Sequence, residues 1–426
     1  MKALEADLII QNCAELLTVR NGTGRPKTGK ALGDIGLIKN GAVAVSRGEI
    51  IWVGESTDLG RHVRAGRKTK IIDADGKIVM PGFVDPHTHL IFAGSREREW
   101  LERLAGRDYL RVLKSGGGIL STVNWTRKAT RTELVRAGLK RLNRMLENGT
   151  TTVESKSGYG LTIKDEIKIL DSMRALMLIQ PVEIVPTFLG AHAVPPEFGD
   201  SRSYARFVAD RMVPEVARRG LADYCDVFCE DGAFSASDAA IVLESAMKNG
   251  LQTKMHVNEF NDLGGTKVAA ALHPKSLDHL DVISARTMSD VRRSGSVAVL
   301  LPGVAFFLGR EAYPQANKFI SNGVPVALGT DFNPGTCFCY SMQFIISLSC
   351  IKMGLSAEQA INCATINAAH AIGRADRLGS IEVGKQADFI IMEISTYRQI
   401  PYSVAANNVS LVVKNGAVAL DRTRLF

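Results

Sequence analysis

Apolar runs separated by Gly, Asn and Asp divide the chain into β-rich ends and a different middle. At both ends, short runs rich in β-branched residues alternate with turn signals, and Asn415-Gly416 is typical of a hairpin turn. The strands expected there are 6–10, 42–46, 50–53, 69–73, 77–80, 388–393, 410–413 and 417–420. The shared pattern predicts that the two ends meet in one small composite β-sandwich domain.

The middle of the chain alternates strand-like and helix-like segments. The expected strands are 79–92, 150–155, 182–189, 224–230, 252–259, 276–280, 296–302 and 325–331, with helices such as 134–148, 163–179, 238–248 and 285–293 between them. Strands that alternate with helices in this way predict an α/β fold, a (β/α)8 TIM barrel. We expect the sandwich to occupy 1–80 and 383–426, and the barrel to occupy 81–382.

Composition and charge exclude several classes of protein. The net charge of +8, from 52 basic and 44 acidic residues, is scattered without a run of five like charges, so no nucleic-acid partner is expected. No apolar run has the length of a membrane span or signal peptide, so no membrane partner is expected. The seven cysteines are dispersed without the paired spacing of zinc sites. We therefore expect the cysteines to be reduced thiols in a cytoplasmic protein.

The placement of histidines carries the strongest chemical signal. His87 and His89 are two residues apart, so on a strand both imidazoles share one face and form half of a divalent-metal site. Other histidines and carboxylates follow or end the later predicted strands: His192, His256, Glu259, His279 and Asp331. Each alone would be an ordinary hydrogen-bonded core residue. Because the carboxyl ends of barrel strands form the active face, their joint placement predicts a metal site at the barrel mouth.

Six sequence blocks carry a resemblance to a known family. They are FVDPHTHLIFAGSRERE (83–99), SGGGI (115–119), ESKSGYGL (154–161), TFLGAHAVP (187–195), HVNEF (256–260) and LGTDFNPGT (328–336). The HxH and GTD elements resemble the amidohydrolase superfamily as a whole. SKSGYG, FLGAHAVP and DFNPG are similar to the imidazolonepropionase family within it. The blocks span most of the barrel, and no position expected to carry chemistry departs from the pattern.

The resemblance implies an activity and a set of site residues. The activity is hydrolysis of the cyclic amide of 4-imidazolone-5-propanoate to N-formimidoyl-L-glutamate, in L-histidine degradation. The implied metal ligands are His87, His89, His256 and Asp331, and the implied catalytic residues are Glu259, His279 and Asp331. The implied substrate contacts are Arg96, Tyr159, His192, Glu259, Asn333, Gly335 and Thr336, with Tyr109 and the loop 116–118 at the border. A homodimer is also implied.

The chemistry of this residue set agrees with that activity. Three imidazoles and one carboxylate suit zinc or ferrous iron, and an open position would activate a water molecule. Relatives with a second metal carry a bridging lysine on the fourth strand, and 224–230 has none, so one metal per chain is expected. Asp331 or Glu259 would take the proton of the water, and both alternatives stay open. His279 would polarise the carbonyl, and the planar guanidinium of Arg96 would bind the propanoate.

Two other functions fit parts of the pattern. A deaminase or hydrolase of another nitrogen heterocycle would share the metal ligands, but its pocket would suit a neutral base instead of a carboxylate. A non-catalytic scaffold relative would be expected to have lost metal ligands, and none is lost here.

Overall fold

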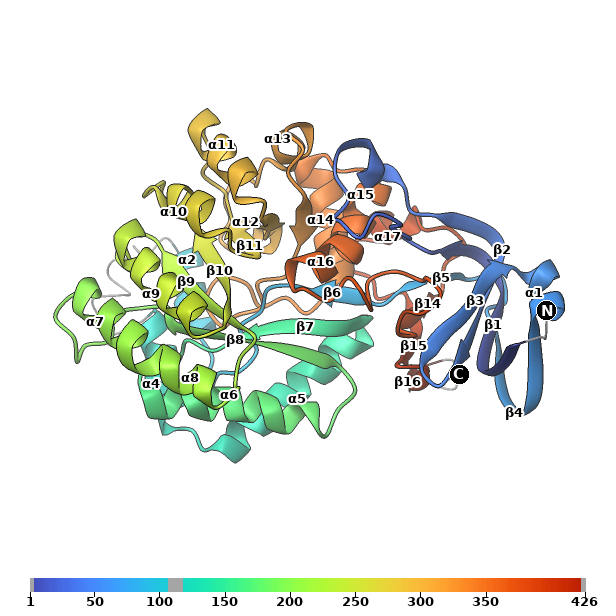
Figure 1. Cartoon of the computed structure of the whole chain (residues 1–426), viewed down its shortest axis with the longest axis horizontal. Helices are drawn as coiled ribbons and strands as arrows, with labels where there is room; N and C mark the ends of the chain where they lie inside the picture. Colours follow the sequence, from blue (N-terminus) through green and yellow to red (C-terminus); the bar gives the residue numbers. More distant parts are fainter. Residues whose placement is uncertain (1–3, 106–117, 423–426) are drawn as a thin grey trace.

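Two eight-stranded sheets organise the computed structural model, which describes residues 4–105 and 118–422. Figure 1 shows a helix-covered barrel and, at the end where both termini lie, a smaller sheet region. The fold class expected from the sequence, a (β/α)8 barrel with a small β domain built from both termini, is confirmed.

The barrel strands follow one another in chain order, and every neighbouring pair is parallel. They are β6 (Phe83–Asp85), β7 (Thr150–Lys156), β8 (Glu183–Ala191), β9 (Tyr224–Cys229), β10 (Gln252–Val257), β11 (Ser276–His279), β12 (Val297–Leu300) and β13 (Val326–Leu328). A parallel bridge between Thr88 and Phe332 joins the first strand segment to the last. Across this seam the amide of His89 donates to the Phe332 carbonyl at 2.8 Å. The two edges of the sheet therefore meet where the predicted ligands begin.

Helices surround the barrel, and most of them contribute buried residues to its core (Figure 1). They are α2 (Glu97–Leu104), α4 (Ile119–Lys128), α5 (Arg131–Glu147), α6 (Ile163–Met177), α7 (Ser201–Phe207), the π-helical η3 (Val208–Met212), α8 (Val213–Arg218), α9 (Ala236–Lys248), α10 (Gly265–Leu272), α11 (Ala285–Ser294), α12 (Pro302–Phe307), α13 (Ala316–Ser321), α14 (Met342–Met353), α15 (Ala357–Cys363) and α16 (Ile366–Ala371). Reciprocal capping boxes begin α5, at Thr130 and Glu133, and α9, at Ser235 and Asp238. These local signals fix where each helix starts relative to the strand before it.

The second sheet combines strands from both ends of the chain in the order β16-β15-β14-β5-β1-β2-β3, with β4 also pairing with β1. Its strands are β1 (Leu4–Leu17), β2 (Leu37–Ser46), β3 (Glu49–Glu55), β4 (Val63–Asp73), β5 (Ile78–Pro81), β14 (Phe389–Met392), β15 (Val409–Lys414) and β16 (Ala417–Asp421). Two short helical turns lie against this sheet, η2 (Ser56–Asp58) and α1 (Leu59–His62), whereas η1 (Gly29–Gly33) contacts α15 and α17 (Gln399–Tyr402) contacts α14. The antiparallel pairing of β5 with β14 joins the two ends.

Alternation along β14 gives this sheet two buried faces. Ile390 and Met392 belong to the large core that includes the barrel, whereas Phe389 and Ile391 belong to the separate core of the terminal sheet. The terminal sheet is thus packed onto the barrel through one face.

The expected single strand over 79–92 is wrong and is divided in the structure. Pro81 lacks an amide donor, and a side chain at Gly82 would collide with Thr151, so the chain changes sheets here. β5 joins the terminal sheet, and the barrel strand β6 is only three residues long. His87 and His89 therefore follow the strand, but they flank the bridged Thr88 and keep the expected alternation. The domain boundaries at 80/81 and 382/383 stay a prediction.

Among the described residues, no helix is both long and apolar enough to cross a bilayer.

Candidate metal centre and active site

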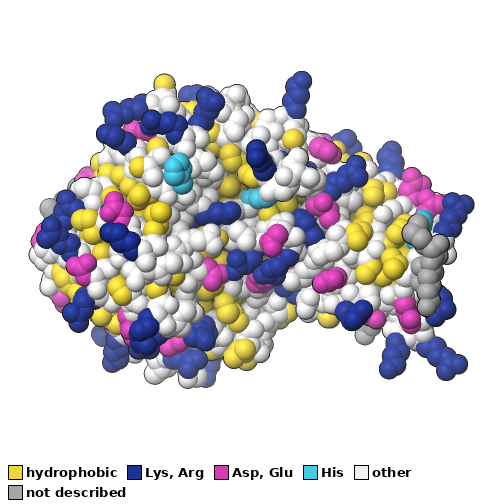
Figure 2. Space-filling model, viewed as in Figure 1, with side chains coloured by type: hydrophobic (Ala, Val, Ile, Leu, Met, Phe, Trp, Pro, Cys, Tyr) yellow, Lys and Arg dark blue, Asp and Glu magenta, His cyan; other side chains and the backbone are white. Residues whose placement is uncertain are grey.

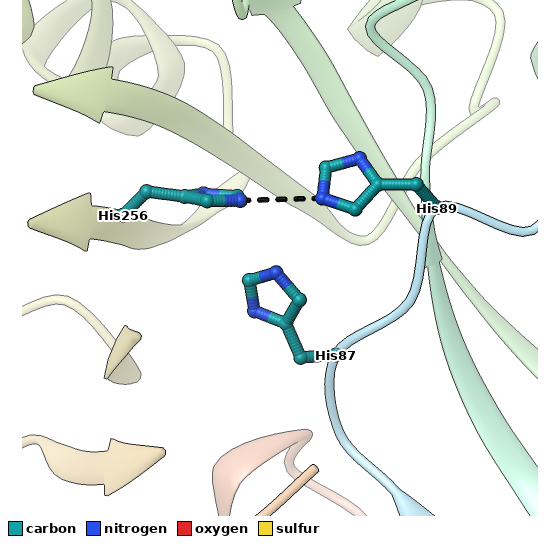
Figure 3. Close-up of side chains that lie close together, drawn as sticks. All are labelled: His87, His89 and His256. Carbon is teal, nitrogen blue, oxygen red and sulfur yellow. Dashed lines mark hydrogen bonds between the residues drawn. The ribbon is translucent and has the colours of Figure 1, made fainter. Parts of the chain in front are cut away.

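Four of the predicted ligands converge at the carboxyl ends of the barrel strands. Figure 3 shows the imidazoles of His87, His89 and His256 pointing toward one another. His256 Nε2 lies 3.4 Å from His89 Nε2. Asp331 Oδ1 lies 3.3 Å from His87 Nε2 and 3.5 Å from His89 Nε2. The four side chains, all buried, come from three different strand ends.

Left-handed backbone occurs at several non-glycine residues around the site, including Asp331 among the predicted ligands. Asn258, His279, Leu280 and Asp331 have φ values of 57°, 79°, 57° and 49°. Such conformations are unfavourable for L-residues and persist only where the surrounding structure imposes them. They lie at or just past the ends of β10, β11 and β13, where they re-aim the chain into the barrel mouth.

Two carboxylates lie against the Nδ1 atoms of His87 and His256. His87 Nδ1 makes a 2.7 Å hydrogen bond to Asp278 Oδ2, and His256 Nδ1 lies 3.0 Å from Asp226 Oδ2 without hydrogen-bond geometry. The hydrogen bond places the ring proton of His87 on Nδ1, so the lone pair of this neutral ring is on Nε2. Burial, together with the positive charge of Lys156, holds the pKa of His87 well below its usual range, so this ring is neutral.

The donor set fits a divalent cation. His87 Nε2 and Asp331 Oδ1 are buried without a hydrogen-bond partner, although they face each other with lone pairs. A cation between them would satisfy both atoms. Four ligands about 2.1 Å from one tetrahedral ion stand about 3.4 Å apart, which matches the separations given above.

Beneath the imidazoles lies a buried charge network whose residues have no role in the predicted site. Lys156 Nζ is 2.8 Å from Glu154 Oε1, 2.8 Å from Asp226 Oδ2 and 3.3 Å from Asp278 Oδ2. Lys254 Nζ donates to the Pro86 carbonyl at 3.0 Å. The available signal was the presence of charged residues inside otherwise apolar strands.

A cavity of about 270 Å³ opens above the metal centre. Its lining includes these predicted site residues: His89, Arg96, Tyr159, His192, His256, Glu259, His279, Asp331, Asn333 and Thr336. Gly335 lies behind Arg96, where any side chain would collide with the guanidinium. Arg103 and Phe260 also line the cavity and were not predicted. Tyr109 and residues 116–117 of the predicted border lie outside the described residues.

Glu259 and His279 form a second titratable pair in the cavity. Glu259 Oε2 is 3.7 Å from His279 Nε2. Burial, reinforced by the nearby Asp331, raises the pKa of Glu259 well above its usual range. Burial lowers the pKa of His279 to about 3, so this imidazole is neutral at pH 7. Shifts of this kind are typical of groups that exchange protons with a substrate.

Arg96 and the loop 157–161 form the opposite side of the cavity. Arg96 Nε donates to Glu99 Oε2 at 2.7 Å, which orients the guanidinium. The buried carboxylate of Glu166 accepts from the amides of Gly158, Gly160 and Leu161 at 2.8, 2.6 and 2.8 Å. These bonds fix the loop that carries Tyr159.

Comparisons with known proteins agree with this geometry. The profile of the Amidohydrolase family matches residues 78–419. The chain is 45% identical over 421 residues to an imidazolonepropionase of Symbiobacterium thermophilum, covering 98% of both chains. It is 44% identical over 422 residues to an imidazolonepropionase of Geobacillus kaustophilus, covering 98% of this chain and 99% of the relative.

Solved structures show the same fold at low sequence identity. An adenosine deaminase from Xanthomonas campestris with bound zinc matches with a TM-score of 0.74 and 18% identity, covering 99% of this chain and 94% of that one. Guanine deaminase of E. coli matches with a TM-score of 0.67 and 17% identity, covering 97% and 99%. The full-length identity to the curated relatives is far more specific than these fold matches. The chain belongs to the amidohydrolase family and, within it, to the imidazolonepropionases.

Proposed function

We propose that this cavity is the active site in which the cyclic amide of 4-imidazolone-5-propanoate is hydrolysed to N-formimidoyl-L-glutamate. One observation carries the proposal: three imidazoles and a carboxylate converge at the floor of a cavity that also holds the guanidinium of Arg96. Family membership supports the hydrolase activity and the small-molecule substrate.

We propose His87, His89, His256 and Asp331 as the ligands of one zinc or iron ion per chain. The three nitrogen donors and one oxygen donor suit either metal, and β9 carries no lysine that could bridge a second ion. When bound, the ion supplies Lewis acidity and a water molecule of lowered pKa.

The chain's own residues then move the protons. Either Asp331 or Glu259 takes a proton from the attacking water as its oxygen adds to the ring carbonyl carbon. The amide C–N bond breaks, and the ring nitrogen receives a proton, which Glu259 is placed to deliver. Neutral His279 donates toward the carbonyl oxygen as negative charge develops there. The raised pKa of Glu259 suits a group that both accepts and returns a proton.

Substrate orientation is assigned to the opposite side of the cavity. The guanidinium of Arg96 matches the propanoate geometrically and electrically. Tyr159 and His192 supply neutral polar groups for the ring heteroatoms, and His192 Nδ1 is held by the Gly158 carbonyl at 3.0 Å. Asn333 binds the amides of Gly335 and Thr336 through its Oδ1, at 2.7 Å each, and thereby shapes the far wall.

A deaminase acting on a neutral heterocycle is the competing function, since several fold neighbours are deaminases. The buried Arg96, with a side chain only 10% exposed, favours an anionic substrate instead. Incubation with 4-imidazolone-5-propanoate, followed by the loss of its ultraviolet absorbance, tests the proposal directly. Turnover of guanine or adenosine, with none of the imidazolone, would establish the deaminase instead.

We further propose a cytoplasmic protein that forms a homodimer and binds no nucleic acid. All seven cysteines are free thiols, which supports a reducing compartment. Figure 2 shows Lys and Arg side chains scattered over the visible face among acidic and apolar ones, which supports weak polyanion binding. The homodimer rests on the family resemblance and is tested by sedimentation.

A further inference from the structure

Two buried aspartates beneath the metal centre each share one oxygen between an imidazole and the same lysine. Asp278 Oδ2 lies 2.7 Å from His87 Nδ1 and 3.3 Å from Lys156 Nζ. Asp226 Oδ2 lies 3.0 Å from His256 Nδ1 and 2.8 Å from Lys156 Nζ. A single ammonium therefore joins the two carboxylates that orient imidazoles arriving from different strands.

The other oxygen of each aspartate is fixed independently. Asp278 Oδ1 accepts from the Ser276 hydroxyl at 2.6 Å. Asp226 Oδ1 accepts from the amides of Val227 and His256 at 2.7 and 3.1 Å. Only the Oδ2 positions depend on Lys156. Lys254 Nζ is more distant, 3.9 Å from Asp278 Oδ2, and is not shared with Asp226 Oδ2 through a contact of this kind. Without the Lys156 ammonium, the two buried carboxylates would lose the cation that they share, would repel each other and would turn away from the imidazoles.

We propose that Lys156 is a positioning residue that sets the metal affinity of the site through Asp226 and Asp278. It is fully buried and does not line the cavity, so its contacts with the site are made through these carboxylates. The proposal rests on the metal ligands proposed above. It assigns a role to a residue that contacts neither these ligands nor the substrate.

The direction in which metal affinity changes when Lys156 is removed distinguishes a positioning role from a purely electrostatic one. A positive charge near a cation site repels the metal, so if charge alone mattered, removal of Lys156 would tighten binding. If the ammonium holds the two carboxylates in place, its removal weakens binding. Loss of the partners that orient metal ligands costs about 10–100-fold in affinity.

The test uses the double variant Lys156→Met/Glu154→Gln. It removes one buried cation and one buried anion together, so the formal charge of the network is unchanged. The matched control is Glu154→Gln alone, because the Glu154 carboxylate pairs with the ammonium groups of Lys156 and Lys254 and does not orient an imidazole. Metal-free forms are titrated with Zn²⁺ in competition with a chromophoric chelator, after circular dichroism has confirmed the fold.

We expect the Kd for Zn²⁺ of the double variant to exceed that of the control by about 10–100-fold. A Kd within about twofold of the control, or a lower one, overturns the proposal. If the double variant does not fold, Lys156→Gln is measured against the wild type with the same criterion. His256→Ala tests the proposed metal site separately from the role of Lys156. If that variant binds Zn²⁺ as the wild type does, the metal site itself is wrong.

Discussion

Arg96 is the residue through which we propose that the cavity recognises a carboxylate. It lies seven residues after His89, and Glu99 accepts from its Nε atom and orients the guanidinium. The guanidinium lines the cavity, and its planar donor groups match the geometry of a carboxylate-bearing ligand.

Arg96→Met is expected to raise KM for the imidazolone by about 10–100-fold, because a charge-assisted hydrogen bond contributes about 1.5–3 kcal/mol. Steady-state kinetics measure the change. Arg98→Met, an exposed arginine in the same charged run, is the matched control and should leave KM unchanged. Normal kinetics of Arg96→Met would show that the propanoate is bound elsewhere.

His256→Ala removes a nitrogen donor whose lone pair faces the centre of the site. We expect loss of stoichiometric metal and of turnover, while the far-ultraviolet circular dichroism stays that of the folded barrel. Elemental analysis of the purified protein measures the first effect. His62→Ala changes an exposed histidine in the terminal region and should retain both metal and activity. Metal retention by His256→Ala would place the site elsewhere.

The sequence predicted the residues whose chemistry is unusual and missed those whose role is supportive. His87, His89 and Asp331 stood out because histidine is scarce and because the family motifs contain them. Lys156 lies in the SKSGYG block and Asp226 in the fourth predicted strand, but neither was given a role, because the sequence does not show which charged residues of other strands they contact. Their partners lie on other strands, and only the closed barrel brings them together.

At the scale of elements, the loops that follow the strands carry the cavity, and buried side chains hold them. Glu166, in the first turn of α6, binds three amides of the loop that follows β7. Periodicity predicted both elements well. It could not predict this contact, nor the division of 79–92, because each depends on packing between elements.

Glu166→Gln is expected to loosen the loop that carries Tyr159. In the wild type the carboxylate accepts from backbone N–H groups. The glutamine side chain would turn its own N–H group toward one of them, and the lost hydrogen bond would lower the free energy of unfolding by about 1–3 kcal/mol. Urea denaturation should show this loss, together with a raised KM. Glu133→Gln makes the same change at an exposed capping box and should cost less. Unchanged stability and kinetics would show that Glu166 does not hold the loop.

The whole molecule behaves as one folding unit if the shared core is continuous. Ile390 of β14 is fully buried and belongs to the core that includes the barrel. A side chain at Gly149, which connects α5 to β7, would lie 3.2 Å from the Cδ1 atom of Ile390. The terminal sheet and the barrel are therefore in direct contact.

Ile390→Ala is expected to lower the free energy of unfolding by about 2–5 kcal/mol. The loss should appear equally in the ellipticity of the barrel helices and in the fluorescence of Trp52, read in a Trp100→Phe/Trp125→Phe background. Ile71→Ala, at a side chain 54% exposed, is the control and should change little. Separate transitions for the two signals would show that the sheet unfolds independently of the barrel.

The seam of the barrel gives the metal site a topological role. The amide of Asp331 donates to the His87 carbonyl at 3.1 Å, so residues from the first and last strand segments are neighbours only while the barrel is closed. An ion shared by His87, His89 and Asp331 would cross-link the two edges, much as a disulfide closes a long loop. Metal loading would then slow any opening of the barrel at this seam, and an opened barrel would release its metal. Catalytic competence would then require the barrel to stay closed at this seam.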